Sequence, residues 1–218
     1  MDPADRFVEL VQRPPGDVHL DVAAGLIGVC FDSGVDVAAV TESLDRLAGE
    51  CVPTFDGVLQ QFQHHLTGNL TDYGDPRNSY LHEVLHRGVG IPITLSVCAI
   101  EIGRRLGVEI HGIGLPGHFM VESGGVFADP FHAGRCFSAD ELEPAWRRMT
   151  GLQDRLDPRL LAPVPQRGIL LRMLNNLKAT FVAMDDPVPL RTLAVLRSAF
   201  PELAQERAEY ARWLRHWN

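Results

Sequence analysis

The sequence has no apolar run close to the ~20 residues that a membrane-spanning helix requires. Its first five residues, MDPAD, carry neither the basic flank nor the apolar stretch of a secretory signal. The four cysteines include no CxxC pair, and a chain of 218 residues can bury a core without covalent staples. We therefore expect a cytoplasmic protein with free thiols, and neither a disulfide framework nor a cysteine-rich zinc site.

Positive charge is scarce in the first quarter of the chain. Residues 1–60 carry 11 acidic and 3 basic side chains, whereas residues 167–218 carry 8 basic and 5 acidic ones. An acidic front repels a phosphate backbone, and the mixed charges of the C-terminal segment are typical of a solvated helix face. We expect no nucleic-acid partner, no membrane partner and no cofactor, so that a binding partner would be a protein or peptide.

Helical spacing of apolar residues dominates the N-terminal third. It predicts helices over residues 5–11, 19–31, 35–49 and 55–66. After a turn-rich segment, Asn78 or Ser79 is placed to cap a helix that runs to residue 87. Pro92 then suits the first turn of a buried helix, and Gly107 suits its end.

The pattern changes after residue 107. Short segments over 108–114, 117–122 and 126–129, separated by Pro-Gly and Gly-Gly, predict an antiparallel meander of strands. Ser138 and Glu141 form a capping-box pattern before a helix over 139–149, and helices over 169–183, 190–200 and 202–217 follow. The prediction is one α+β unit with an N-terminal helical layer (1–67), a mixed core (68–150) and C-terminal helices (151–218).

Two polar residues of the meander stand at strand ends. His118 opens the second predicted strand and Asp129 ends the third, so neighbouring antiparallel strands can bring the two side chains into hydrogen-bonding distance. A carboxylate that orients an imidazole forms the second half of a Cys-His-Asp triad for acyl transfer. A nucleophilic cysteine would gain most from the helix dipole at the start of the preceding helix, near residues 92–94.

Several short motifs follow one another in the central segment. Residues 78–131 contain NSYL, VLHR, GIPITLS, RRLG, PGHF and DPF in this order, and RMLNNLK follows at 172–178. With these motifs the chain resembles the SirB-type transglutaminase-like family, a branch of the papain-like transglutaminase superfamily. The resemblance implies a buried helix on a small antiparallel sheet, and it maps His118 and Asp129 onto the histidine and acid of the superfamily. It leaves residues 92–94, the place of the nucleophile, without a cysteine.

Two functional hypotheses follow from this missing cysteine. The first is a binding or regulatory module without catalysis that uses a cleft around His118 and Asp129. The second is an acyl transferase or amide hydrolase in which Cys98 attacks, His118 is the base and Asp129 orients the histidine. Cys98 lies one to two turns inside the helix, where the dipole effect has faded and a packed core cysteine is the commoner case. Further residues assigned to the cleft are Thr94, Pro116, Gly117 and His132.

A third hypothesis rests on a different motif. His82-Glu83-Val84-Leu85-His86 matches HExxH on a predicted helix, where histidines four apart share one face and can hold zinc. Glu101 on the next helix is a candidate third ligand. The pattern is short, and two solvated histidines on an exposed helix face are the competing interpretation.

Overall fold

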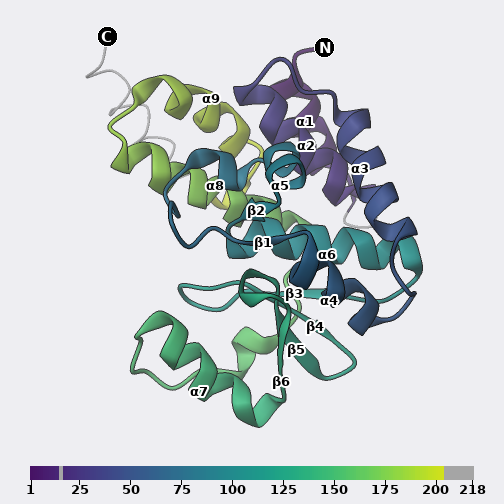
Figure 1. Ribbon diagram of the computed structural model, residues 1–218. Helices are drawn as coiled ribbons and strands as arrows, with labels where there is room; N and C mark the ends of the chain where they lie inside the picture. The colour runs from purple at the N-terminus through teal and green to yellow at the C-terminus, as the bar shows by residue number, and fades with distance from the viewer. Residues whose placement is uncertain (15–16, 204–218) are drawn as a thin grey trace.

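The computed structural model describes residues 1–14 and 17–203 of the chain (Figure 1). Four helices form the N-terminal layer: α1 (Pro3–Val11), α2 (Leu20–Phe31), α3 (Val37–Gly49) and α4 (Phe55–His64). All four were predicted, with ends that differ by two residues at most. Asp36 caps α3 and Thr54 caps α4 through side-chain oxygens that accept backbone N–H groups.

The segment before the central helix is more ordered than its turn-rich sequence indicates. It contains a two-residue strand β1 (Thr67–Gly68), a 3₁₀ turn η2 (Pro76–Ser79), the helix α5 (Leu81–Arg87) and β2 (Val89–Gly90), which pairs with β1 in parallel. The prediction that Asn78 or Ser79 caps α5 is wrong, because Tyr80 occupies the cap position without a side-chain bond. Asn78 is instead fully buried. Its Oδ1 accepts a hydrogen bond from Asn69 Nδ2 at 3.0 Å, and its Nδ2 donates one to the Asp72 carbonyl at 2.7 Å.

Helix α6 (Pro92–Leu106) runs through the middle of the molecule. Pro92 stands in its first turn, and Gly107 ends it with a φ of 71°, so both predicted boundaries are confirmed. Its first twelve residues are buried except for Ile100, and its last turn binds the N-terminal layer through Arg105, which pairs with Asp21 at 2.7 Å. This helix joins the helical layer to the sheet.

A four-stranded antiparallel sheet lies below α6 in Figure 1, with the strand order β3-β4-β5-β6. The strands are β3 (His111–Ile113), β4 (Met120–Ser123), β5 (Val126–Asp129) and β6 (Arg135–Phe137), and the last of these was not predicted. Val121 and Ala128 belong to the main core with α6, whereas Met120 and Phe127 pack with Trp146 of α7 (Ala139–Thr150). The alternation of side chains along each strand thus buries both faces of the sheet.

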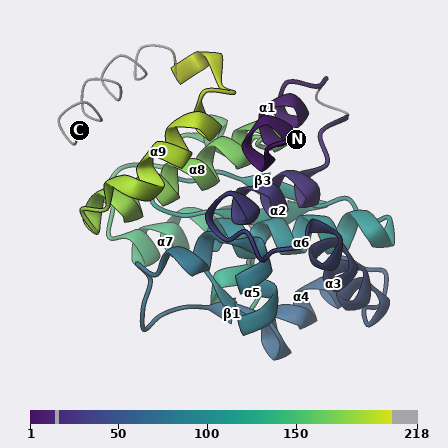
Figure 2. The same ribbon diagram turned by 90° about the horizontal axis from the view of Figure 1, so that it is seen from above.

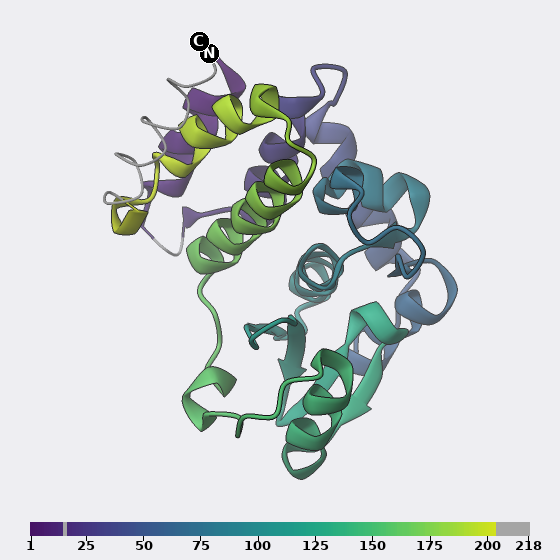
Figure 3. The ribbon, with the colours of Figure 1, turned by 90° about the vertical axis from the view of Figure 1, so that its left-hand side faces the viewer.

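The C-terminal part closes the structure on the side away from α7. After the turn η4 (Pro158–Leu161), helix α8 (Gln166–Ala183) and helix α9 (Pro187–Arg197) lie side by side, as Figures 2 and 3 show. The last described element is the 3₁₀ turn η5 (Pro201–Leu203), so nearly all of the predicted helix over 202–217 lies outside the described residues. None of the described helices is both long and apolar enough to cross a membrane.

Candidate functional site

Asp129 is the centre of the candidate site. It ends β5 and caps the 3₁₀ turn η3 (Pro130–His132), whose first residue is a proline without an N–H group. Its Oδ1 accepts the backbone N–H groups of Phe131 at 3.0 Å and His132 at 3.4 Å. These two bonds fix the plane of a fully buried carboxylate and leave Oδ2 free for other donors.

Two histidines meet at that second oxygen. His118 Nε2 and His132 Nδ1 each lie 2.7 Å from Asp129 Oδ2. The hydrogen bond predicted between His118 and Asp129 is therefore confirmed, and His132 joins the same carboxylate. Burial alone would raise the pKa of Asp129, but the hydrogen bonds from His118 and His132 outweigh it and lower the pKa to about 2. The bond to Asp129 in turn raises the pKa of His132. We call these three residues the His–Asp–His cluster.

The backbone at His118 is held from two sides. His118 follows a turn in which Gly117 adopts a φ of 71°, a conformation that favours glycine. Arg172 of α8 donates its Nη2 to the carbonyls of Leu115 and of His118, the latter at 2.7 Å. From the other side, Trp146 Nε1 of α7 donates to the Pro116 carbonyl at 2.8 Å. Sequence reasoning noted Arg172 only within a motif and missed this supporting role.

Aromatic rings pack against the cluster. The ring of Phe131 meets His118 edge-on at a centroid distance of 6.2 Å, and His132 at 5.0 Å. The ring of Tyr73 also packs against Phe131, at a centroid distance of 6.0 Å, and Tyr73 is itself 54% exposed. His118 is buried, whereas the His132 side chain is 40% exposed, so the cluster is reached from the His132 side.

The start of α6 carries no thiol. Its first turn contains Pro92, Ile93 and Thr94, and the Thr94 side chain is fully buried without a hydrogen-bond partner among the described residues. Cys98 is also fully buried, within the apolar core, and burial raises the pKa of its thiol to about 12. At neutral pH this thiol stays protonated, and a protonated thiol is a poor nucleophile.

The remaining cysteines are also not placed to form a catalytic triad with His118 and Asp129. Cys30 on α2 and Cys51 after α3 are half-buried in the N-terminal layer, and burial raises the pKa of both thiols. Cys136 on β6 is exposed, but the strand register pairs it with Ala128 and sets Arg135 opposite Asp129. Because side chains alternate between the faces of a strand, Cys136 and Asp129 point to opposite faces.

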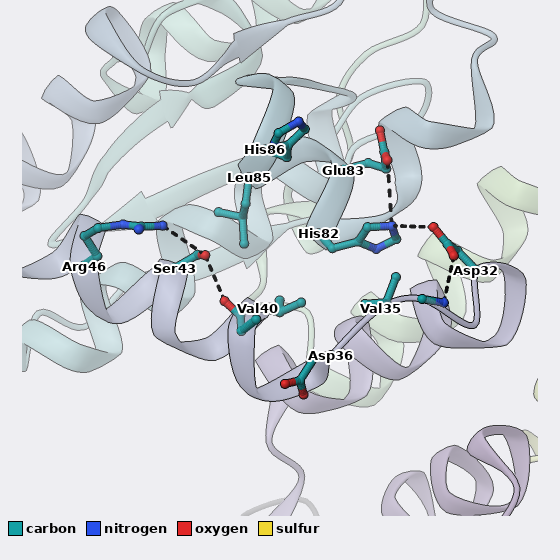
Figure 4. Close-up of a pocket in the computed structure, with 12 residues that line it drawn as sticks. Asp32, Val35, Asp36, Val40, Ser43, Arg46, His82, Glu83, Leu85 and His86 are labelled. Atoms are coloured by element: carbon teal, nitrogen blue, oxygen red, sulfur yellow. Dashed lines mark hydrogen bonds and ion pairs between the residues drawn. The ribbon is translucent and has the colours of Figure 1, made fainter.

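The HExxH residues do not converge on a common point. Figure 4 shows His82 of α5 turned toward Asp32 and Glu83, with His86 pointing elsewhere, around a pocket of about 540 Å³. His82 Nε2 lies 3.9 Å from Asp32 and 4.0 Å from Glu83, and neither ring nitrogen has a hydrogen-bond partner among residues 1–14 and 17–203. Glu101, the candidate third ligand, forms ion pairs with Arg104 and Arg105 at 2.8 Å each.

Comparison with known proteins places the chain in a family. Residues 38–175 match the family model of the transglutaminase-like superfamily. The chain belongs to the transglutaminase-like superfamily. The pairing of α6 with the antiparallel sheet is accordingly the papain-like core of this fold class, as the resemblance implied.

The relatives of this transglutaminase-like chain are themselves described mainly by family. It is 42% identical over 126 residues to a UPF0162 protein of Xylella fastidiosa, a match that covers 55% of this chain and 45% of that protein. It is 31% identical over 213 residues to a UPF0162 protein of Pseudomonas aeruginosa, covering 91% of this chain and 76% of that one. Human F-box only protein 21 is 30% identical over 122 residues, which are 50% of this chain and 18% of that protein. No solved structure matches the chain.

Proposed function

We propose that this chain is a SirB-type transglutaminase-like protein that has lost catalysis and serves as a cytoplasmic binding module. One observation carries the proposal: the first turn of α6, where the superfamily nucleophile belongs, contains no thiol, and Cys98 is enclosed in the core. The histidine and the acid are nevertheless held in place by bonds to their side chains and backbone. A site kept in order without its nucleophile is suited to recognition.

The exposed surface beside the cluster would make the contact. The edge of His132, the neighbouring Tyr73 ring and the exposed backbone at Pro116 and Gly117 form a partly aromatic surface with one ionisable edge. Aromatic side chains such as tyrosine are enriched in protein interfaces. We propose a protein or peptide as the partner. Thr94, which the sequence assigned to the cleft, is too deeply buried to touch it.

Thiol reactivity tests this proposal directly. Native protein is treated with iodoacetamide at neutral pH, and each cysteine is followed by peptide mass spectrometry. We expect Cys136 to react no faster than glutathione, and Cys98 to react only after unfolding, because a reactive catalytic thiol needs a lowered pKa and solvent access. A thiol that reacts faster than glutathione, and loses this advantage in the His118→Ala variant, would contradict the proposal.

The enzymatic alternative keeps one favourable observation. The 2.7 Å bond between His118 and Asp129 is the geometry that a general base and its orienting acid need. In the alternative, Cys98 supplies the nucleophile for acyl transfer or amide hydrolysis. The same alkylation experiment separates the two hypotheses, because this alternative requires Cys98 to be the accelerated thiol.

A further inference from the structure

The His–Asp–His cluster has a second chemical property besides its hydrogen bonds. His118, Asp129 and His132 each offer one ligand atom, and these three atoms lie within 4.8 Å of one another. In the part of the chain that the structure describes, no other group of three or more His, Cys, Asp or Glu side chains meets this condition. From this convergence we propose that the cluster is a binding site for one divalent transition-metal ion of the zinc type.

Two of the three distances between ligand atoms are close to those around such an ion. Metal–nitrogen and metal–oxygen bonds of about 2.0–2.1 Å in a tetrahedral site put neighbouring ligand atoms roughly 3.3 Å apart. His118 Nε2 and His132 Nδ1 now lie 2.7 Å from Asp129 Oδ2. Each nitrogen therefore needs to move about 0.6 Å away from this oxygen, and the two nitrogens, now within 4.8 Å of each other, need to lie about 3.3 Å apart.

The carboxylate is already fixed in the orientation that a ligand needs. Both backbone bonds fall on Oδ1 of Asp129, so Oδ2 keeps its lone pairs directed at the two imidazoles. Hydrogen bonds that orient a metal-coordinating side chain contribute strongly to metal affinity. Arg172 of α8 orients His118 in a similar way, because its guanidinium donates a hydrogen bond to the backbone carbonyl of His118.

The donor set selects the class of ion. Two imidazole nitrogens and one carboxylate oxygen suit zinc, cobalt, nickel or copper, whereas calcium and magnesium prefer all-oxygen sites. Binding requires unprotonated nitrogens at Nε2 of His118 and Nδ1 of His132. In a neutral ring that proton moves to the other ring nitrogen, and a charged ring releases it to solvent. The His132 side chain is 40% exposed, so solvent and an incoming ion can reach this edge of the cluster.

This inference rests on the proposed function and names a ligand of the same site. An imidazole committed to a metal ion cannot also take a proton from a thiol, so the metal site and a cysteine triad exclude each other at His118. The two proposals are still tested separately. Reactive thiols would overturn the proposed function, whereas absence of metal binding with inert thiols would overturn only the metal site.

The experiment is a zinc titration of chelator-treated full-length protein by calorimetry, with cobalt as a spectroscopic probe. We expect one zinc ion per chain and a cobalt spectrum without the charge-transfer band of a thiolate ligand. His132→Gln should lower the affinity more than about tenfold, since even the loss of a residue that merely orients a ligand costs 10- to 100-fold. His132 is partly exposed, so this variant should fold, which circular dichroism verifies.

Two control variants locate the ion. His19→Ala removes an exposed histidine that makes no side-chain cap bond, and it should leave the affinity unchanged. The double variant His82→Ala, His86→Ala removes the HExxH histidines and should also bind one ion. The proposal is overturned if zinc binding is not saturable, if His132→Gln binds zinc like the parent protein, or if the double variant alone loses the ion.

Discussion

Replacing Asp129 by asparagine tests whether the charge of this carboxylate organises the site. The variant keeps the size of the side chain, and the amide oxygen can still accept the backbone N–H groups of Phe131 and His132. What changes is the group that faces the two imidazoles. A charge-assisted hydrogen bond contributes about 1.5–3 kcal/mol, against about 0.5–1.5 kcal/mol for a neutral one. With two such bonds weakened, we expect metal-free Asp129→Asn to lose about 2–3 kcal/mol of unfolding free energy.

The assay is urea unfolding at pH 7 in the presence of a chelator, followed by circular dichroism. For a chain of this size the expected loss corresponds to a fall in Tm of roughly 4–12 °C. Asp154→Asn is the matched control, since Asp154 is exposed and makes no side-chain bond in the described structure, and its change should stay within about 0.5 kcal/mol. If Asp129→Asn were as stable as this control, the hydrogen bonds from both histidines to the Asp129 carboxylate would not contribute to the unfolding free energy as predicted.

Three further predictions concern the surroundings of the cluster. Gly68→Ala would place a Cβ 2.5 Å from the Phe131 carbonyl oxygen, so we expect a loss of about 1–3 kcal/mol in urea unfolding and weaker zinc binding, whereas Gly49→Ala, with nothing within 4 Å, should not destabilise. Arg172→Lys removes a planar donor shared by two carbonyls and should cost about 1–3 kcal/mol by the same measurement; an unchanged midpoint would refute its supporting role. Burial lowers the pKa of the His82 imidazole, so as the pH falls the unfolded chain binds a proton at His82 before the folded chain does, and stability is lost as the pH falls through about 6.5. His82→Gln should flatten that pH dependence, and an unaltered slope would contradict the assignment.

The helices were predictable where local signals and burial agree. Pro92 and Gly107 bracket α6 because one fixes φ for the first turn and the other tolerates the left-handed conformation after the last. Ser138 likewise starts α7 with its predicted capping box. These signals act within a few residues of the chain, and nothing distant has to be known to interpret them.

Elements that depend on distant partners were not predictable in this way. Strand β6 consists of Arg135, Cys136 and Phe137, a run with no alternation long enough to mark a strand, and it exists because β5 offers an edge to pair with. Asn78 has the local chemistry of a cap, but the folded loop gives its side-chain amide four hydrogen-bond partners and leaves the cap position to Tyr80. The choice between these roles is made by tertiary contacts.

The contacts of the candidate site can also be separated into those that the sequence predicts and those that it does not. The pairing of His118 with Asp129 was predictable from the antiparallel pairing of β4 with β5, although His118 lies two residues before β4 and does not open it as predicted. The arrival of His132 at the same oxygen does not follow, since it depends on the tight 3₁₀ turn that Asp129 itself caps. Arg172 reaches the site from α8, more than fifty residues along the chain, and no local pattern signals that contact.

The position of Cys98 along α6 supports the proposed binding function over the enzymatic alternative. Thr94 and Cys98 are four residues apart and share a face of the helix, so the cysteine lies about 6 Å deeper beneath a threonine that is itself fully buried. Exposing the thiol would require the first turns of α6 to unwind, and Ile93, Leu95 and Val97 would lose their burial. At about 1.5–3 kcal/mol for each side chain, that rearrangement costs roughly 5–9 kcal/mol, comparable with the whole stability of an ordinary domain. A thiol that can act only at such a cost is a core residue, and this favours the proposed binding role of the His–Asp–His cluster over a cysteine triad.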